Sequence, residues 1–130
     1  MIVDSSALLA VVLKETDEER FARALLAAPA LRISAANWVE ATIVVDGRDP
    51  AVASRFEDLM AFLGMEIVPV SVDQAYRARV AYREYGRGYH AARLNYGDCF
   101  AYALAKDAGE ALLFKGGDFA QTDIEPALRG

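Results

Sequence analysis

The sequence is poor in the two side chains that most often bind zinc or act as a nucleophilic pair. It contains one cysteine, Cys99, and one histidine, His90. A single cysteine cannot form an internal disulfide, which is the usage expected of a protein in a reducing cytoplasm. A zinc site made of clustered histidines and cysteines is not expected either. Cys99 lies between Asp98 and Phe100 in an apolar segment, so we expect it to be a small core residue.

Long apolar segments and targeting signals are also missing. The longest uninterrupted apolar run covers residues 7–13, far short of the roughly 20 residues that span a bilayer. The first residues contain neither a basic region nor a small-residue cleavage site, so no signal peptide is expected. Neither GRGYHAA nor KGGDF matches the phosphate-binding loop of nucleoside triphosphatases or the dinucleotide pattern. These absences predict a cytoplasmic protein that does not enter a membrane and does not hydrolyse nucleoside triphosphates.

What the sequence does contain is typical of one globular domain. Apolar residues make up 55% of the 130 residues and charged residues 25%, so the chain can form one sizeable core. We therefore predict a single domain over residues 1–130. The formal net charge of −5, from 19 acidic and 14 basic side chains, argues against a general nucleic-acid coat protein. It does not argue against a local basic patch.

Short apolar strands alternate with helices along the chain, which is typical of a parallel sheet covered by helices on both faces. Strands are expected at residues 2–4, 31–34, 66–70 and 111–114, and helices at 5–13, 16–28, 35–46, 50–63, 72–85 and 98–108. We expect Ser5 or Ser6 to cap the first helix, and Thr16 to form a capping box with Glu19 on the second. In such a fold the functional crevice lies beyond the carboxyl ends of the strands.

Most of the 19 carboxylates lie where helix termini, turns or polar faces explain them, but four do not. Asp4 ends the first apolar strand. Glu40 is embedded in the apolar helix NWVEATIVV, and Asp98 opens the apolar helix DCFAYALA. Asp118 follows the apolar strand ALLF after a glycine pair. Taken singly, each could be a helix cap, the partner of an arginine or a turn residue. Four carboxylates that converge on one crevice, however, would raise one another's pKa values.

A divalent cation would allow four such carboxylates to share one crevice. Oxygen ligands without clustered histidine or cysteine favour Mg²⁺, or Mn²⁺, over zinc. Carboxylate-held magnesium commonly acts on phosphate esters, where it lowers the pKa of a bound water and neutralises the leaving oxygen. That chemistry needs no protein nucleophile, which agrees with the absence of a Ser–His or Cys–His pair. The acids alone therefore indicate metal-dependent hydrolysis of a phosphate ester.

All six tyrosines fall between residues 76 and 102, and the same window is rich in arginine. On the helix expected at 72–85, a solvated face with packed rings explains them. The residues that differ lie in the loop leading to the last acidic helix and are Arg87, Tyr89, His90 and Arg93. Arginines and stackable rings near a metal centre suit single-stranded nucleic acid, whose phosphates need charge and whose unpaired bases need flat surfaces. Composition favours a solvated loop and an RNA contact equally.

Four segments of the chain resemble the acidic motifs of PIN-domain ribonucleases. They are MIVDSSALLAVVLKE, AANWVEA, LNYGDCFAYALAK and LLFKGGDFAQTDI. The resemblance covers nearly the whole chain, with the motifs in order. The last two motifs together are similar to those of the VapC toxins of bacterial toxin–antitoxin pairs in particular.

The resemblance implies a PIN-like (Rossmann-like) three-layer α/β/α sandwich with a short, mainly parallel central sheet. It implies an endoribonuclease that depends on Mg²⁺ or Mn²⁺ and cleaves tRNA, mRNA or another translation-related RNA. It also implies inhibition by a VapB-type antitoxin, whose C-terminal segment would lie across the groove. The expected assembly is a homodimer that forms a heterotetramer or larger complex with the antitoxin.

The resemblance also assigns roles to individual residues. By position, the core acids of the family, which are its catalytic residues and metal ligands, correspond to Asp4, Glu40 and Asp98. Asn37 lies one helical turn before Glu40 and is a candidate for orienting it. Ser6 and Asn95 are candidates for supporting Asp4 and Asp98 in the same way.

The fourth acidic position departs from the family pattern. Relatives often carry an acid or amide immediately before the Asp-Phe pair, whereas this chain has Gly116 and Gly117 there. Either Asp118 serves as the fourth catalytic acid or the site works with three. The departure leaves open a second function, that of a catalytically weak PIN-like module that binds RNA or a protein. A phosphatase on the same fold class is less well supported, because no DxD-type nucleophile motif follows the first strand.

Overall fold

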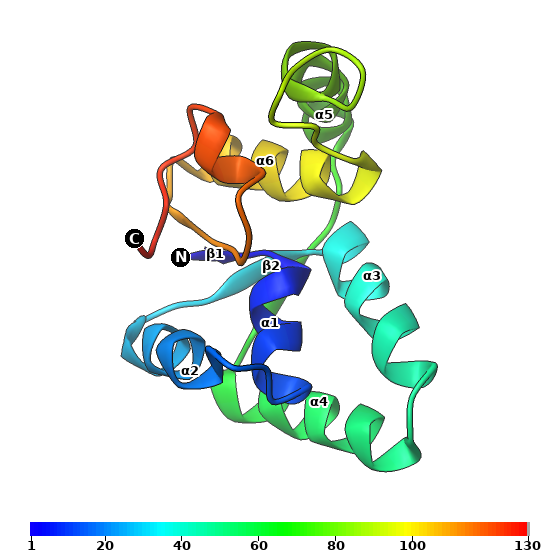
Figure 1. The fold of residues 1–130 in the computed structure, drawn as a ribbon, viewed down its shortest axis with the longest axis vertical. Helices are drawn as coiled ribbons and strands as arrows, with labels where there is room; N and C mark the ends of the chain where they lie inside the picture. Colours follow the sequence, from blue (N-terminus) through cyan, green and yellow to red (C-terminus); the bar gives the residue numbers. More distant parts are fainter. Residues whose placement is uncertain (130) are drawn as a thin grey trace.

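The four strands of the protein form one parallel sheet in the computed structural model, which describes residues 1–129 (Figure 1). The strands are β1 (Ile2–Val3), β2 (Arg32–Ser34), β3 (Glu66–Val68) and β4 (Leu112–Leu113). Their order across the sheet is β3-β2-β1-β4, so the chain builds the sheet outward from β1 and then returns to place β4 on its other side. Every pair is parallel, as the alternation of strands and helices predicted.

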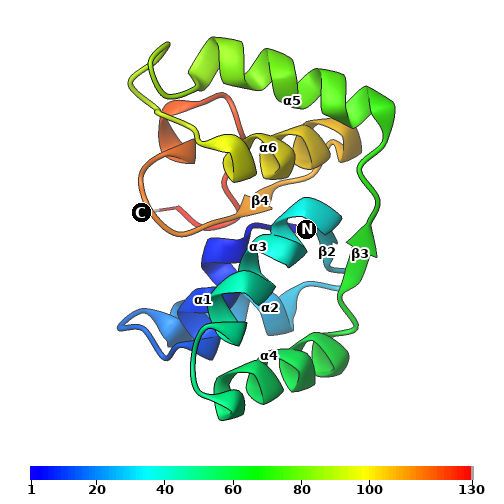
Figure 2. The same cartoon turned by 90° about the vertical axis from the view of Figure 1, so that its right-hand side faces the viewer.

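Helices cover both faces of the sheet, which confirms the predicted three-layer α/β/α sandwich (Figure 2). The helices are α1 (Ser5–Val12), α2 (Glu18–Ala27), α3 (Ala35–Asp46), α4 (Pro50–Leu63), α5 (Val72–Tyr85) and α6 (Tyr96–Ala108), followed by the 3-10 turn η1 (Phe119–Gln121). The first four helices pack on one face, and α5 and α6 pack on the other. Within residues 1–129, no helix combines the length and the apolar character that a bilayer crossing requires.

Alternation along the neighbouring strands β1 and β4 builds a separate core on each face of the sheet. Ile2 and Leu112 point into the core shared with α5 and α6, whereas Val3 and Leu113 point into the core shared with α1 to α4. All four side chains are fully buried, and each contributes on the order of 1.5–3 kcal/mol of burial free energy. Because successive strand residues face opposite ways, strands of two residues are long enough to join both cores.

The start of α2 differs from the sequence prediction. The helix begins at Glu18, its N-cap position is Asp17, and that side chain makes no capping hydrogen bond. The predicted capping box of Thr16 with Glu19 is therefore wrong. The carboxylate of Asp17 is instead drawn away from the helix by an ion pair with Lys115.

The boundaries of the next helices follow the prediction. Gly47 ends α3, and Pro50 is the first residue of α4. Gly64 ends α4 with a φ of +61°, a conformation that glycine adopts without strain. Ser71 caps α5 by accepting the backbone N–H of Gln74 at 3.1 Å.

The unexplained acids gather at the edge of the sheet where the strand order reverses. β1 and β4 are neighbours although β2 and β3 lie between them in the sequence, so the crevice at their carboxyl ends is the switch point of the topology. Asp4 follows β1 directly, and the segment that carries Asp118 follows β4. Glu40 is on α3, the helix that follows β2. The fold thus places Asp4 and the segment with Asp118 beyond the carboxyl ends of neighbouring strands, as the sequence pattern predicted.

Candidate active site

Asp4 lies at the carboxyl end of β1, with 3% of its surface exposed. It is the N-cap of α1, the role predicted for Ser5 or Ser6, because its Oδ2 accepts the Ser6 backbone N–H at 3.1 Å and the Ser6 hydroxyl at 2.6 Å. Its other oxygen, Oδ1, is buried and has no hydrogen-bond partner within residues 1–129. A buried carboxylate oxygen without a donor costs free energy. Oδ1 is therefore an atom that a bound cation would stabilise.

Glu40 is half-buried in α3 and is held by donors from two elements. Ser5 Oγ donates to Glu40 Oε1 at 2.6 Å, and the Asn37 side-chain amide donates to the same oxygen at 3.3 Å. The Asn37 amide also donates to the carbonyl of Gly97 at 2.9 Å, which ties α3 to the first turn of α6. In the described part of the chain, no arginine or lysine pairs with Glu40. The carboxylate is thus oriented by neutral groups and keeps its charge uncompensated.

The first turn of α6 lies directly against Glu40. A side-chain carbon added at Gly97 would lie 2.1 Å from Glu40 Oε2, closer than any real contact. Any larger residue here would force the Glu40 carboxylate or α6 to move, so glycine allows this close approach without an unusual backbone conformation.

Asp98 is the third residue of α6, not its first as predicted, because the N-cap is Asn95. The two residues form a capping box. Asn95 Oδ1 accepts the Asp98 backbone N–H at 2.8 Å, and Asp98 Oδ2 accepts the Asn95 backbone N–H at 3.0 Å. This exchange fixes the Asp98 carboxylate at the amino end of the helix, where the helix dipole favours a negative charge.

Asp118 is exposed at the start of η1, and its side chain makes no capping hydrogen bond. Gly116, with a φ of +102°, and Gly117 precede it, and open space surrounds both. The charge of Asp118 nevertheless contributes to raising the pKa of Asp98. Asp118 therefore acts electrostatically on the same crevice as the other acids, from its rim.

The electric fields of the four acids overlap. Burial raises the pKa of Asp4 to about 6, and the charge of Glu40 adds to this shift, while the hydrogen bonds from Ser6 oppose it. Burial also raises the pKa of Asp98 to about 7, with further contributions from the charges of the other three acids. Mutual repulsion, the cause expected from the sequence, is thus smaller than desolvation. Carboxylates perturbed in this way are typical of functional sites.

The donor set fits a hard divalent cation. The four acids supply oxygen ligands only, and the buried Oδ1 of Asp4 lacks a partner. Within residues 1–129, however, no three acidic, histidine or cysteine side chains converge closely enough to hold a metal ion by themselves. One oxygen of each of two acids is already engaged, Glu40 Oε1 by Ser5 and Asp98 Oδ2 by the Asn95 N–H. A cation here would complete its coordination with water or substrate oxygens, as Mg²⁺ commonly does.

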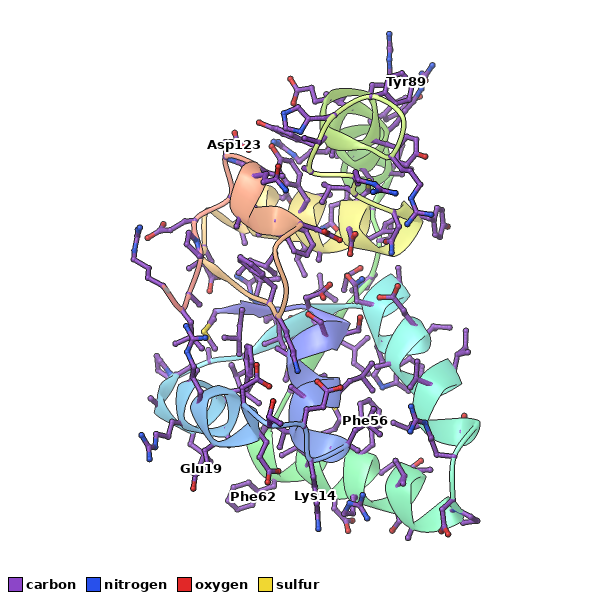
Figure 3. All side chains as sticks on the ribbon, viewed as in Figure 1. Lys14, Glu19, Phe56, Phe62, Tyr89 and Asp123 are labelled. Carbon is purple, nitrogen blue, oxygen red and sulfur yellow. The ribbon has the colours of Figure 1, made fainter. Side chains whose placement is uncertain are left out.

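The loop predicted to contact RNA, residues 86–95, packs on the last turns of α5. The ring of Tyr89 contacts that of Tyr82 edge-on, with 5.9 Å between ring centres. The ring of His90 contacts that of Tyr85 in the same way, at 5.1 Å. Both rings are thus partly engaged by the protein itself, while Tyr89 still projects outward at one end of the molecule (Figure 3).

The two arginines of this loop are exposed and without acidic partners. Arg87 and Arg93 form no ion pair within residues 1–129, and no hydrogen bond there joins the side chains of Arg87, Tyr89, His90 or Arg93 to the four acids. Their charges are therefore available to an external anion. The RNA-binding role of Arg87, Tyr89, His90 and Arg93 stays a prediction.

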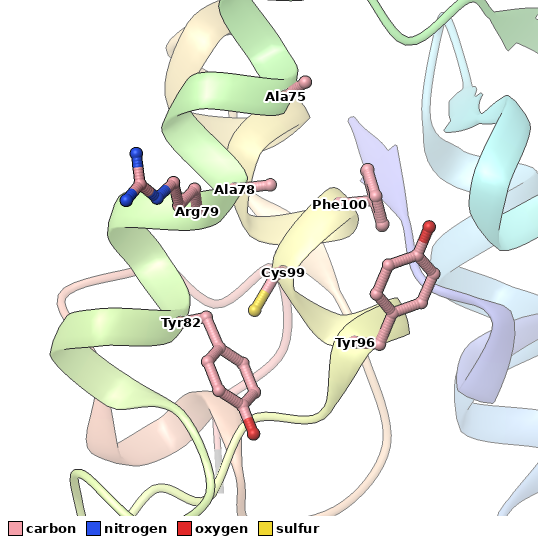
Figure 4. Close-up of a pocket in the computed structure, with 7 residues that line it drawn as sticks. All are labelled: Ala75, Ala78, Arg79, Tyr82, Tyr96, Cys99 and Phe100. Carbon is pink, nitrogen blue, oxygen red and sulfur yellow. The ribbon is translucent and has the colours of Figure 1, made fainter.

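Cys99 is a core residue, as predicted, and it borders a pocket. The pocket has a volume of about 460 Å³ and lies between α5 and α6 (Figure 4). It is lined by Ala75, Ala78, Arg79, Tyr82, Tyr96, Cys99 and Phe100. Cys99 is 3% exposed, and burial raises the pKa of its thiol to about 12. A thiol that stays protonated near neutral pH is a poor nucleophile, so Cys99 is not a candidate nucleophile.

Sequence reasoning missed three residues that support the site, namely Ser5, Gly97 and Lys115. Ser5 was considered only as a helix cap, although its hydroxyl binds Glu40. Gly97 was taken as the end of a loop, although a glycine directly before Asp98 in a helical turn was an available signal. An ordinary helical position would favour alanine, the better helix former, so a glycine there indicates a close contact. Lys115 donates its backbone N–H to Ser6 Oγ at 2.9 Å, a contact that no local pattern indicates.

Comparison with known proteins places the chain in a family. Residues 1–125 match the family profile described as the PIN domain. Ribonuclease VapC42 of Mycobacterium tuberculosis is 47% identical over 129 residues, which are 98% of this chain and 98% of that protein. Ribonuclease VapC30 of the same species is 46% identical over 125 residues, or 95% of each chain.

Solved structures share the fold. Mycobacterium tuberculosis VapC20, described as a sarcin–ricin loop cleaving toxin, superposes with a TM-score of 0.80 at 15% identity, covering 99% of this chain and 98% of that one. A chain of a toxin–antitoxin complex from Klebsiella pneumoniae superposes with a TM-score of 0.70 at 23% identity, covering 94% and 92%. The profile match and the relatives that share nearly half of its sequence show that the chain belongs to the PIN-domain family and, within it, to the VapC ribonucleases.

Proposed function

We propose that the protein is the toxin of a toxin–antitoxin pair and that it cleaves RNA internally with the help of Mg²⁺ or Mn²⁺. The observation that carries the proposal is the buried Asp4, whose Oδ1 has no protein partner, in a crevice where the pKa values of Asp4 and Asp98 are raised. The names of its relatives, which are ribonucleases, support the reaction class.

In this proposal, Asp4, Glu40 and Asp98 hold the cation. When bound, the ion would lower the pKa of a water and neutralise charge on the phosphodiester. Ser6 and Asn95 orient the carboxylates of Asp4 and Asp98 through the hydrogen bonds described above. Within residues 1–129, no positive side chain pairs with these acids, so their charge is left for the cation. Since protons compete with the cation for both aspartates, cation binding to the metal-free protein should strengthen as the pH rises through about 6 to 7.

The RNA would approach over the exposed arginines and rings of residues 86–95. Free guanidinium groups suit phosphates, and rings suit unpaired bases. The substrate within this class, whether tRNA, mRNA or another translation-related RNA, belongs to the proposal as an expectation from the family resemblance.

The proposal includes a protein partner and self-association. One structural neighbour was solved as a toxin–antitoxin complex, which supports inhibition by a VapB-type antitoxin. The large apolar side chains that stay exposed include Val39 and Ile43 on α3 and Tyr76 and Val80 on α5. Such side chains support a homodimer, which would form a heterotetramer or larger complex with the antitoxin.

A second candidate is a catalytically weak PIN-like module that binds RNA or a protein without cleaving. The feature that favours it is the pair Gly116–Gly117, which supplies no acid immediately before Asp118. The exposed position of Asp118 points the same way, because its oxygens are far more hydrated than those of Asp4.

The deciding experiment is cleavage of total RNA and of purified tRNA by the protein with Mg²⁺, Mn²⁺ or EDTA. We expect cleavage with either cation, none with EDTA, and none from Asp98→Asn. The wild type should also arrest growth when expressed alone, whereas Asp98→Asn should not. No metal-dependent cleavage of any RNA would favour the binding module, and equal growth arrest by Asp98→Asn would show that toxicity is not nucleolytic.

The variant Asp118→Asn decides between three and four catalytic acids. If Asp118 supports the cation, its loss should lower the cleavage rate about ten- to hundredfold, as for a group that assists a metal ligand. A rate within twofold of the wild type would assign the chemistry to Asp4, Glu40 and Asp98 alone.

A further inference from the structure

Lys115 lies on the loop after β4, and its backbone supports the buried acid of the site. Its N–H donates to Ser6 Oγ at 2.9 Å, and the Ser6 hydroxyl donates in turn to Asp4 Oδ2 at 2.6 Å. The Lys115 N–H occupies a lone pair of the Ser6 hydroxyl oxygen. Because a hydroxyl has a single proton, this contact favours the rotamer in which Ser6 donates that proton to Asp4. Oδ1 of Asp4 is left as the oxygen without a partner.

The side chain of Lys115 reaches the turn between α1 and α2. Its Nζ donates to Glu15 Oε1 at 2.6 Å and to Asp17 Oδ1 at 2.9 Å. These hydrogen bonds raise the pKa of Lys115 and lower that of Asp17, so both groups stay charged near neutral pH. The two ion pairs anchor the beginning of the loop between β4 and η1 to the far end of α1.

The remainder of this loop has few other restraints. The glycine pair after Lys115 carries no side chains and has open space around it, and Asp118 makes no capping bond. The next anchor is Phe119, whose ring contacts that of Phe114 with 5.2 Å between ring centres. Asp118 is therefore held between one anchor at Lys115 and another at Phe119.

We propose that Lys115 is a positioning residue of the active site. Its ion pairs with Glu15 and Asp17 hold the loop where the Lys115 N–H fixes Ser6 against Asp4, and they anchor the segment that leads to Asp118. The inference rests on the proposed function, because it assigns to Lys115 the arrangement of the carboxylates that would bind the cation.

The surroundings of Lys115 favour positioning over direct contact with RNA. One ammonium with two carboxylates forms a cluster of net charge −1, which repels a phosphate. The three side chains are about one third exposed (33%, 36% and 33%), and because solvent screens ion pairs of this kind, they add little to stability. Their main effect is therefore on the geometry of the loop.

The test compares variants that break the ion pairs from either side. Lys115→Met removes the ammonium and keeps the backbone N–H, and the double variant Glu15→Gln/Asp17→Asn removes the partners and keeps the lysine. Lys115→Arg restores a cation. The matched control is Lys106→Met, because Lys106 pairs with Asp123 at 2.9 Å and is similarly exposed, at 30%.

Two measurements do not depend on RNA cleavage. One is the affinity of the metal-free protein for Mn²⁺, measured by titration calorimetry. The other is the hydrogen-exchange rate of the backbone amide at position 115, measured by NMR. The kcat and KM for cleavage of a defined RNA complete the set.

We expect Lys115→Met and the double variant to act alike. Both should weaken Mn²⁺ binding and lower kcat about tenfold, the lower end of the range for groups that support metal ligands, with little change in KM. Both should also speed exchange of the amide at position 115. Lys115→Arg should recover most of the loss, and Lys106→Met should match the wild type.

Two results would overturn the inference. If Lys115→Met raised only KM while the double variant kept full activity, Lys115 would contact RNA directly. If both variants lowered the melting temperature but left Mn²⁺ affinity and amide exchange unchanged, the ion pairs would be structural only. If the wild type binds Mn²⁺ but cleaves no RNA, the proposed function is refuted. Mn²⁺ affinity and amide exchange at position 115 would then still decide the role of Lys115.

Discussion

The carboxylates at the two ends of the sheet differ in whether a cationic side chain or amine pairs with them. At the amino end, Glu110 accepts a hydrogen bond from the Met1 amine at 2.5 Å through Oε1, and its Oε2 pairs with Arg32. At the carboxyl end, Asp4 and Asp98 have no cationic partner within residues 1–129. The same sheet therefore carries one compensated carboxylate and, at its other edge, a group of uncompensated ones.

The presence or absence of a cationic partner distinguishes structural acids from functional ones better than sequence position does. A paired carboxylate is stabilised as an anion and needs nothing further. An unpaired one raises the free energy of the folded state until a ligand supplies the missing charge. Neutralising an acid should consequently change the free energy of unfolding in opposite directions at the two ends of the sheet.

The largest effect on stability is expected from Asp4→Asn in the absence of metal. The folded state raises the pKa of Asp4 from 3.8 to about 6, so between these values the folded protein binds more protons than the unfolded chain. Stability should therefore fall as the pH rises through this window, by about 3 kcal/mol in total. Asparagine removes this penalty and remains a good N-cap. The variant should thus be more stable than the wild type at pH 8, and similar at pH 4.

Urea unfolding of both proteins in EDTA at pH 4, 6 and 8 measures this difference. Asp49→Asn is the control, because Asp49 caps α4 through the Ala51 N–H at 2.9 Å and is exposed. It should leave the pH dependence unchanged. Addition of Mn²⁺ should stabilise the wild type at pH 8 and leave Asp4→Asn unaffected. Equal destabilisation of Asp4→Asn at every pH would contradict the idea that this end of the sheet stores uncompensated charge.

Most of the fold was predictable from local patterns, because each strand and helix carries its own signal. The apolar strands, the glycines that end α3 and α4, and the Ser71 cap all follow from neighbouring residues. The wrong prediction at Thr16 has a tertiary cause. The ion pair between Lys115 and Asp17 fixes the turn before α2, and no local rule includes a lysine from the other end of the chain.

The site was predictable in its acids and not in its supports. Asp4, Glu40 and Asp98 stand out because a carboxylate within an apolar segment contrasts with its neighbours. The hydroxyl of Ser5 on Glu40 and the approach of Gly97 depend on how α1, α3 and α6 pack. Such contacts join residues far apart in the sequence, so composition and periodicity contain no signal for them.

Gly97→Ala should lower both the stability of the protein and its cleavage of RNA. In an exposed helical turn this change would be favourable by about 1 kcal/mol, but here the new carbon would lie 2.1 Å from Glu40 Oε2. The overlap forces α6 or Glu40 to move, at a cost of about 1–3 kcal/mol in stability, and cleavage should fall at least tenfold because Glu40 shifts. Gly47→Ala is the control, since its added carbon meets only ordinary contacts at 3.5 Å. Unchanged stability and activity in Gly97→Ala would show that α6 does not depend on this approach.

The smallest effect is expected at the amino end of the sheet, from Glu110→Gln. The change removes the charge from a carboxylate that pairs with Arg32 and the Met1 amine, in groups that are all partly exposed. Such pairs contribute about 0–1 kcal/mol each, so the free energy of unfolding should decrease by roughly 1 kcal/mol, and less at high salt because ions screen the pair. Cleavage and Mn²⁺ affinity should stay within twofold of the wild type, since the site lies at the other edge. Thermal unfolding at low and high salt, with cleavage assays on the same samples, checks both expectations. If Glu110→Gln stabilised the protein as Asp4→Asn is expected to do, the charge at the two ends of the sheet would not differ in the way the ion pairs indicate.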